Sequence, residues 1–313
     1  MRKILQYLKD YQRKHFDLKL YLLVGLFLTV CIAFNYYFDF EDSVIDLRYG
    51  TPWHWVWMMP WHAFPYVGVC VIFWLYGLNR SWISSGGFWL RILIGFSILA
   101  LERAFYGTAL LQNYLNYVDY RFIAKCINWS SSLIITVIPL LLICIMIEKE
   151  HPRIYYGMAW KRFRAKPYFL LLGIAVVCIG IGSFLSEIQN YYPRFQFSGG
   201  NAYAEKNDLP LWVSVLLYEL AYGSDFISVE LFFRGFLIHA FVRMLGGHAV
   251  LPMVAAYAFL HFGKPLAETI SSIFGGYILG IVSYYTRSIW GGIIIHMGVA
   301  WAMELFGFLQ KLL

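Results

Sequence analysis

The segment DFISVELFFRGF places three ionisable residues, Asp225, Glu230 and Arg234, inside a strongly apolar stretch of the chain. An ionisable side chain near the centre of a bilayer costs roughly 2.5–3.5 kcal/mol on insertion scales, so each one requires an explanation. Glu230 and Arg234 are four residues apart and share one face of a helix. The plain structural interpretation is an ion pair that neutralises itself inside a helical bundle.

Two histidines in the following apolar segments favour a different interpretation. His261 lies in AAYAFLHFGKP and His296 lies in GGIIIHMGVAW. A lone histidine in such a segment is more often a hydrogen-bonded core residue than a catalytic one. Two of them, each in a segment that follows the Glu230/Arg234 helix face, fit that interpretation less well.

A break at Gly246, Gly247 and His248 separates the Glu230 segment from the His261 segment. Glu230 lies 17 residues before Gly247 and His261 lies 14 residues after it. At 1.5 Å per residue, an antiparallel hairpin brings the two side chains to within roughly 5 Å of the same depth. The next segment carries a ridge of small residues, Ser272, Gly276 and Gly280. Such a ridge allows close approach, and we expect the His296 segment to pack on it.

These residue types are those of acid–base hydrolysis. A buried glutamate suits proton transfer to and from water near neutrality. His261 can orient the attacking water or pass on its proton, and His296 can donate to the oxyanion of a tetrahedral intermediate. Arg234 holds Glu230 in position. The expected reaction is attack of water on a peptide carbonyl in a membrane-embedded cavity.

The composition indicates a multi-span membrane protein. Of the 313 residues, 60% are hydrophobic, 14% are charged and 20% are aromatic, whereas soluble domains are nearer one quarter charged. The net charge of +7 lies mainly in short loops between apolar runs, which favours membrane orientation over nucleic-acid binding. The five cysteines show no CxxC pair, so we expect neither a disulfide framework nor a metal site.

The apolar windows predict an all-α, polytopic transmembrane bundle with about nine spans, in a range of eight to ten. Most of the windows are close to the roughly 20 residues that cross a bilayer. They lie near residues 18–37, 64–79, 87–106, 127–147, 168–186, 209–245 (bent or broken), 249–263, 268–285 and 289–310.

Lysine and arginine set the expected orientation. Residues 1–19 and 148–167 carry six basic residues each, which predicts a cytoplasmic N-terminus and a cell-membrane protein. The basic loop also divides the chain into residues 1–150, with four spans of unknown role, and residues 168–313, which hold the chemical motifs.

The motifs resemble those of the CAAX protease and bacteriocin-processing (CPBP) family of intramembrane endopeptidases, whose patterns are EExxxR, FxxxH and HxxxN. Here they read VELFFR from Val229 to Arg234, YAFLH from Tyr257 to His261, and HMGVA from His296 to Ala300. The resemblance covers residues 168–313. It implies that glutamate and the first histidine activate water, that the second histidine and asparagine form an oxyanion hole, and that no metal is required.

Two positions depart from the family pattern. Val229 stands where the first glutamate belongs, and Ala300 stands where asparagine belongs. Either Glu230 serves as the base from one position along, which is a 100° rotation on a helix, or hydrolysis is lost. The alanine removes one oxyanion donor, a group typically worth about 10²–10³ in rate.

Other polar residues have simpler expected roles. Asp225 either adds a carboxylate to the site or begins the helix, Glu304 accepts a hydrogen bond, and Glu102 and Arg103 pair with another helix. His54 and His62 belong to an interfacial aromatic belt rather than a metal pair, and Lys264-Pro265 stops a helix with a solvated lysine.

Three functions remain open from the sequence. The first is an intramembrane endopeptidase that uses Glu230, His261 and His296, with Arg234 positioning the base. Its partners would be membrane lipid and a peptide or protein substrate, lipidated or otherwise membrane-associated, with no cofactor. The second is a catalytically impaired scaffold or immunity-type binding protein, which Val229 and Ala300 favour. The third, a transporter or channel, lacks the inverted repeat expected of one.

Overall fold

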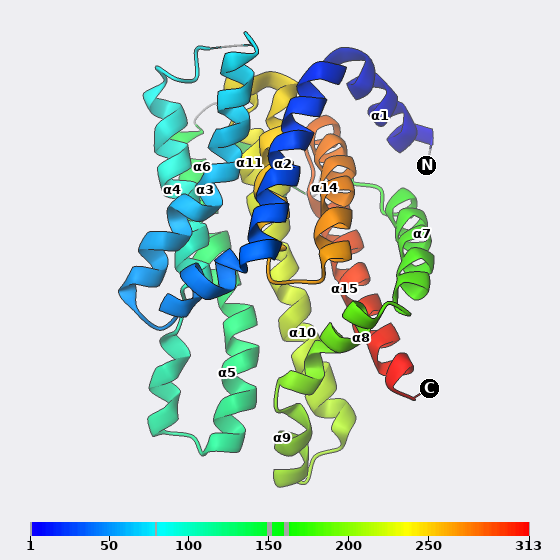
Figure 1. The fold of residues 1–313 in the computed structure, drawn as a ribbon. Coiled ribbons are helices and arrows are strands. Elements are labelled where there is room, and N and C mark those ends of the chain that lie inside the picture. The colour runs from blue at the N-terminus through cyan, green and yellow to red at the C-terminus, as the bar shows by residue number, and fades with distance from the viewer. Residues whose placement is uncertain (1, 79, 149–151, 160–162, 313) are drawn as a thin grey trace. The chain divides into compact units, whose positions relative to one another are not determined.

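The computed structural model describes residues 2–78, 80–148, 152–159 and 163–312, and all regular structure within these ranges is helical (Figure 1). Lys149, Lys161 and Arg162 of the basic loop lie outside the described residues. The expected all-α class is therefore confirmed for the described part of the chain.

The described chain forms two compact units, each built from three segments. The first unit comprises residues 1–104, 139–163 and 230–290, and the second comprises 105–138, 164–229 and 291–313. The 1–150 and 168–313 regions expected from the sequence both contribute to each unit. The expectation that residues 1–150 and residues 168–313 have separate roles stays a prediction.

Helices of the first unit, with short 3-10 and π turns written η, are α1 (Arg2–His15), α2 (Leu18–Phe38), η1 (Glu41–Ile45), η2 (Asp46–Arg48), α3 (Pro52–Leu75), α4 (Gly86–Arg103), α6 (Ile138–Ile147), η5 (Pro152–Gly157), η7 (Leu231–Phe236), α11 (Leu237–His239), α12 (Val242–Leu245), η8 (Gly246–Ala249), α13 (Val250–Phe259) and α14 (Leu266–Thr286). Those of the second unit are η3 (Gly107–Asn113), α5 (Tyr117–Ser132), η4 (Leu133–Val137), α7 (Lys166–Gly182), α8 (Ser186–Tyr191), η6 (Arg194–Phe197), α9 (Gly200–Lys206), α10 (Leu211–Glu230) and α15 (Trp290–Leu312).

Six described helices are long and apolar enough to cross a membrane, or seven if the bent pair Lys166–Gly182 and Ser186–Lys206 forms one span. Helix length and hydropathy do not confirm the expected nine spans, but they do fit a polytopic helical bundle. α4 and α10 are of spanning length but are absent from the six. α4 carries Arg91, Glu102 and Arg103, and α10 carries Glu219, Asp225 and Glu230, and these charges lower the apolar character of each helix.

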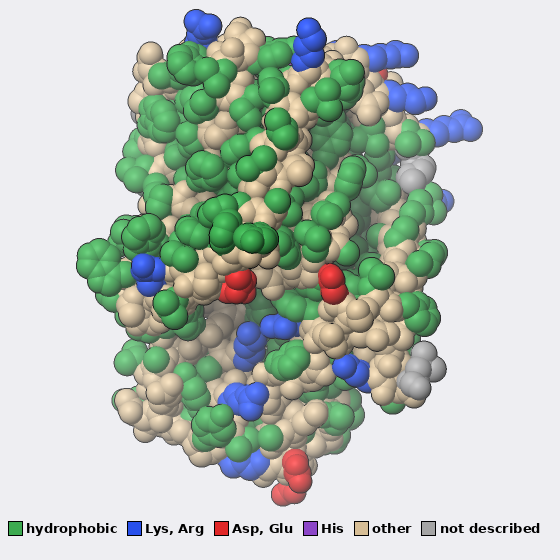
Figure 2. Space-filling view, viewed as in Figure 1, with side chains coloured by type: hydrophobic (Ala, Val, Ile, Leu, Met, Phe, Trp, Pro, Cys, Tyr) green, Lys and Arg blue, Asp and Glu red, His purple; other side chains and the backbone are tan. Residues whose placement is uncertain are grey.

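The centre of the first unit is α13, which packs against α3 and α14. All ten residues of α13 are buried, as expected for a helix that is apolar all round. One face of α2, with Leu20, Val24 and Leu28, joins this core. The opposite face exposes a stripe of apolar side chains suited to lipid, formed by Leu22, Leu26 and Val30. Figure 2 shows hydrophobic side chains over much of the visible surface.

The predicted break in the 209–245 window is a change of helix type. α10 ends at Glu230, and the wider π-helix η7 begins at the next residue. π-helical turns are rare and occur often at functional sites. The predicted hairpin break is also present, because Gly246 has a φ of +58° that side-chain-bearing residues rarely adopt.

The small-residue ridge of α14 packs against α13 and η7. A Cβ atom at Gly276 would lie 2.9 Å from Tyr257 Cδ1, and one at Gly280 would lie 2.5 Å from Met253 Cε. We expected the His296 segment at this ridge, and the structure places α13 there instead. Close approach along the ridge therefore brings α14 onto the helix that precedes His261.

Candidate active site

Glu230 and Arg234 form a buried ion pair at the junction of α10 and η7. Glu230 Oε1 lies 3.1 Å from Arg234 Nη1, and the two side chains are 0% and 1% exposed. The pair keeps the site electrically balanced. Loss of either member would leave an uncompensated charge in an apolar interior, which is strongly unfavourable. The ion pair expected from the sequence is therefore present.

Tyr257 connects this ion pair to His261. The Arg234 guanidinium carbon lies 3.8 Å from the centroid of the Tyr257 ring, a cation–π contact. The Tyr257 and His261 ring centroids are 4.6 Å apart. The structure thus brings Glu230, Arg234 and His261 into one continuous series of contacts within the first unit.

The backbone of Tyr257 also sets the tautomer of His261. His261 Nδ1 lies 2.9 Å from the Tyr257 carbonyl oxygen. A carbonyl oxygen only accepts, so Nδ1 carries the hydrogen and donates it. In the neutral ring, Nε2 then has the lone pair. His261 is 5% exposed, and Nε2 of the neutral ring can accept a hydrogen bond.

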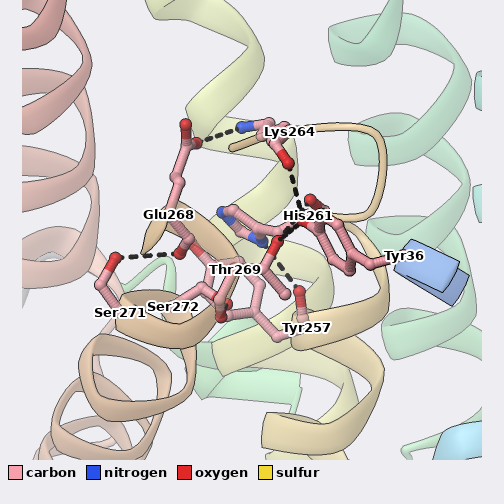
Figure 3. A network of polar contacts seen from close by, with 8 residues as sticks. All are labelled: Tyr36, Tyr257, His261, Lys264, Glu268, Thr269, Ser271 and Ser272. Carbon is pink, nitrogen blue, oxygen red and sulfur yellow. Dashed lines mark hydrogen bonds and ion pairs between the residues drawn. The ribbon is translucent and has the colours of Figure 1, made fainter. Parts of the chain in front are cut away.

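The turn that follows His261 is held from two other helices, as Figure 3 shows. Thr269 Oγ1 of α14 donates to the His261 carbonyl oxygen at 2.7 Å. The Tyr36 hydroxyl of α2 donates to the Lys264 carbonyl oxygen at 2.6 Å and lies 2.7 Å from Thr269 Oγ1. Tyr36 of α2 thereby helps to fix the turn that follows α13.

His296 lies in the second unit, on α15. Its ring centroid is 4.4 Å from that of Phe226. Ala300, one turn further along, is buried in an aromatic cluster with Phe122, Phe195, Tyr218, Tyr222 and Phe226. The position where the family has asparagine is therefore used for packing. The participation of His296 in the Glu230–His261 site stays a prediction.

The secondary candidates have structural partners. Glu304 accepts from the backbone N–H groups of Arg194 and Phe195 at 2.6 and 3.1 Å, as expected. Asp225 Oδ1 accepts from Ser228 Oγ at 3.3 Å. The Lys264 side chain is not simply solvated, because its Nζ lies 2.8 Å from Glu268 Oε1. α13 ends at Phe259, five residues before Lys264, and Pro265 is the N-cap of α14 rather than the stop of α13.

The histidines of α3 are buried within the protein. His54 Nε2 lies 3.1 Å from Asp46 Oδ1, and His62 is fully buried. The neighbouring Trp53 is 63% exposed and suits the expected aromatic belt. Within the described ranges no three His, Cys, Asp or Glu side chains gather as metal donors.

Comparison with protein families identifies a match that contains these residues. Residues 209–302 match the family model described as type II CAAX prenyl endopeptidase Rce1-like. The match supports membership of the CPBP family for this segment. The Rce1-like segment contains every residue of the three motifs, and the match supports a protease. No curated protein and no solved structure matches the chain.

Two site residues escaped the sequence analysis. Both contact the turn after His261. Thr269 lies eight residues after His261, and Tyr36 lies more than two hundred residues before Lys264, whose carbonyl group it contacts. No spacing pattern links them to the Rce1-like motifs. Tyr257 stood in the sequence analysis only as the first residue of YAFLH, although its ring contacts Arg234 and its carbonyl oxygen accepts from His261.

Proposed function

We propose that this protein is an intramembrane endopeptidase that cleaves a membrane-associated or lipidated peptide or protein. The observation that carries the proposal is the buried series of contacts from Glu230 through Arg234 and Tyr257 to His261. It lies within the Rce1-like segment. The proposed location is the cell membrane, with the N-terminus in the cytoplasm.

In the proposed reaction, Glu230 accepts a proton from water while the water oxygen bonds to the carbonyl carbon. His261 orients this water through Nε2, since its Nδ1 hydrogen is engaged by Tyr257. His296 donates to the resulting oxyanion. The proton then passes to the amide nitrogen, the C–N bond breaks, and an acid and an amine are released. These side chains supply the acid–base groups, so the proposal includes no cofactor.

The test compares newly formed protein termini in cells that produce equal amounts of each variant. Glu230→Gln and His261→Ala should each abolish the termini that the wild type creates, while the variants remain in the membrane. Glu187→Gln is the matched control, because it removes an exposed carboxylate on α8. Normal cleavage by both site variants would refute the proposal.

A non-catalytic relative is the second candidate, and the burial of Ala300 among aromatic rings favours it. Such a protein would keep the fold and bind a partner helix or peptide. Val229→Glu combined with Ala300→Asn should then create termini that the wild type does not produce. Equal cleavage before and after restoration would exclude this candidate.

A further inference from the structure

The helix that precedes His261 begins beside α1. The Tyr11 hydroxyl of α1 donates to the Gly247 carbonyl oxygen at 2.8 Å, and the ring centroids of His15 and His248 are 5.2 Å apart. Gly247 and His248 belong to η8, which leads directly into α13. The start of α13 therefore lies at the end of the first unit that α1 occupies.

The turn that carries His261 lies at the opposite end of α13, beside the end of α2. Tyr36, which contacts this turn, is two residues before the last residue of α2. The ring centroids of Tyr36 and Phe262 are 6.1 Å apart. A Cβ atom at Gly263 would lie 3.2 Å from Asp42 Oδ1 in η1. His261 is thus close to the connection between α2 and α3.

α14 runs back between the same two ends. Thr269, in its first turn, lies 2.7 Å from the Tyr36 hydroxyl, and Tyr285, in its last turn, stacks on Tyr7 of α1 with centroids 5.2 Å apart. Figure 1 shows α1 beside this end of α14. The 21 residues of α2 rise about 31 Å, which matches a hydrocarbon core of roughly 30 Å. The two ends therefore correspond to opposite faces of a membrane.

The two ends differ in charge. The α1 end has five basic residues on α1 and one acidic residue, Asp10. The connection from α2 to α3, residues 39–51, has four acidic residues and one basic residue, Arg48. Lysine and arginine gather on the cytoplasmic side of membrane proteins. The turn that carries His261 therefore belongs to the outer face.

His261 is also easier to reach from the outer end. Gly263, two residues further on, is exposed. His248 at the other end is 13 residues away, which is about 20 Å along a helix. All ten residues of α13, which lie between, are buried. A peptide that approached from the α1 end would have to displace this packing, whereas one that approached from the outer end would not.

We propose that the hydrolytic site receives its substrate from the outer face of the membrane. The substrate is then a segment of an exported or membrane-anchored protein that lies just outside the hydrocarbon core, and not a cytoplasmic chain terminus. This inference rests on the proposed hydrolysis and on the proposed cytoplasmic N-terminus. It adds the side of the membrane on which the peptide bond is cleaved.

Labelling of newly formed N-termini tests the proposal. A membrane-impermeant amine reagent is applied to intact or permeabilised cells together with their medium, and all strains produce equal amounts of protein. The termini that the wild type creates should be labelled as fully in intact cells as after permeabilisation. They should be lost in Glu230→Gln and His261→Ala. They should be retained in Glu187→Gln, which removes an exposed carboxylate on α8.

The two possible failures are distinguishable. Termini that depend on Glu230 and His261 but are labelled only after permeabilisation would place cleavage in the cytoplasm. That result would overturn this inference and leave the proposed hydrolysis intact. If neither sample contains termini that depend on the wild type, the proposed hydrolysis fails, and this inference fails with it.

A second measurement is independent of cleavage. In a cysteine-free background, Ala267→Cys, in the first turn of α14, should react with a membrane-impermeant thiol reagent in intact cells. Gln12→Cys on α1 should react only after permeabilisation. Both positions are exposed in the folded protein. The reverse pattern would place the turn after His261 at the cytoplasmic face and overturn the inference, whatever the outcome for hydrolysis.

Discussion

Glu230 and Arg234 depend on each other because neither side chain reaches solvent. Arg234→Met should lower the thermal unfolding temperature strongly, since an unpaired buried charge costs about 3–5 kcal/mol. Adding Glu230→Gln should recover much of that loss, because the double variant leaves no buried charge at the pair. Thermal unfolding of the purified protein in detergent measures this coupling. Additive losses in the double variant would mean that the contact at 3.1 Å contributes little.

Glu41 should make stability depend on pH. It lies in η1, outside the spans, and is 2% exposed. Burial raises the pKa of Glu41 from 4.5 to about 7, with Asp46 and Asp42 adding to the shift, while Arg103 and a hydrogen bond from Trp61 oppose it. The folded state then binds more protons than the unfolded state between these two values.

Stability from Glu41 is therefore fully present below pH 4.5 and is lost as pH rises to about 7. Glu41→Gln should flatten this part of the profile of unfolding temperature against pH. Comparison of the two profiles removes the contribution of the other titrating groups. Parallel profiles for the wild type and the variant would contradict the prediction.

At the scale of the helix, α14 contains two adjacent glycines with opposite surroundings. A Cβ at Gly276 would lie 2.9 Å from Tyr257 Cδ1 and 3.8 Å from Arg234 Nη2, whereas one at Gly275 would meet nothing within 4 Å. Gly276→Ala should destabilise the protein by about 1–3 kcal/mol through overpacking and reduce cleavage by displacing Tyr257. Gly275→Ala should be neutral or stabilise by up to about 1 kcal/mol. Similar unfolding temperatures for both variants would argue against close packing at the ridge.

The contact of α2 with the turn after His261 gives the N-terminal spans a role. Tyr36→Phe and Thr269→Val should each cost about 0.5–1.5 kcal/mol and lower cleavage, because they release the carbonyl groups of that turn. A double-mutant cycle should show coupling, since the two hydroxyl oxygens are 2.7 Å apart. Tyr37→Phe is the control, because Tyr37 is 82% exposed. An equal effect of Tyr37→Phe would remove this role.

At the scale of the whole molecule, the basic N-terminus predicts the orientation of the chain. In a cysteine-free background, Tyr37→Cys at the end of α2 should react with a membrane-impermeant thiol reagent in intact cells. Lys3→Cys on α1 should react only after permeabilisation, because positively charged ends stay in the cytoplasm. Both positions are exposed in the folded protein. The reverse pattern would invert the proposed topology.

The helical class, the ends of α2, α14 and α15 to within three residues, and the break at Gly246 all followed from the sequence. Hydropathy, the positions of glycines and the spacing of ionisable residues along one helix depend on local sequence, so they can be identified without the structure. The order of the three motifs was equally visible, and the Rce1-like match covers the same residues. The number of spans was not confirmed, because charged residues within α4 and α10 keep these two helices from meeting the same hydropathy measure.

The partners of the site residues depended on tertiary packing. Arg234 lies over Tyr257, Thr269 and Tyr36 hold the turn after His261, and α13 occupies the ridge of α14 where the His296 segment was expected. These contacts join residues that are distant in the chain, and many apolar side chains would satisfy the same pattern. Only shape complementarity between packed helices selects which side chains meet, so these pairings were decided by the folded structure.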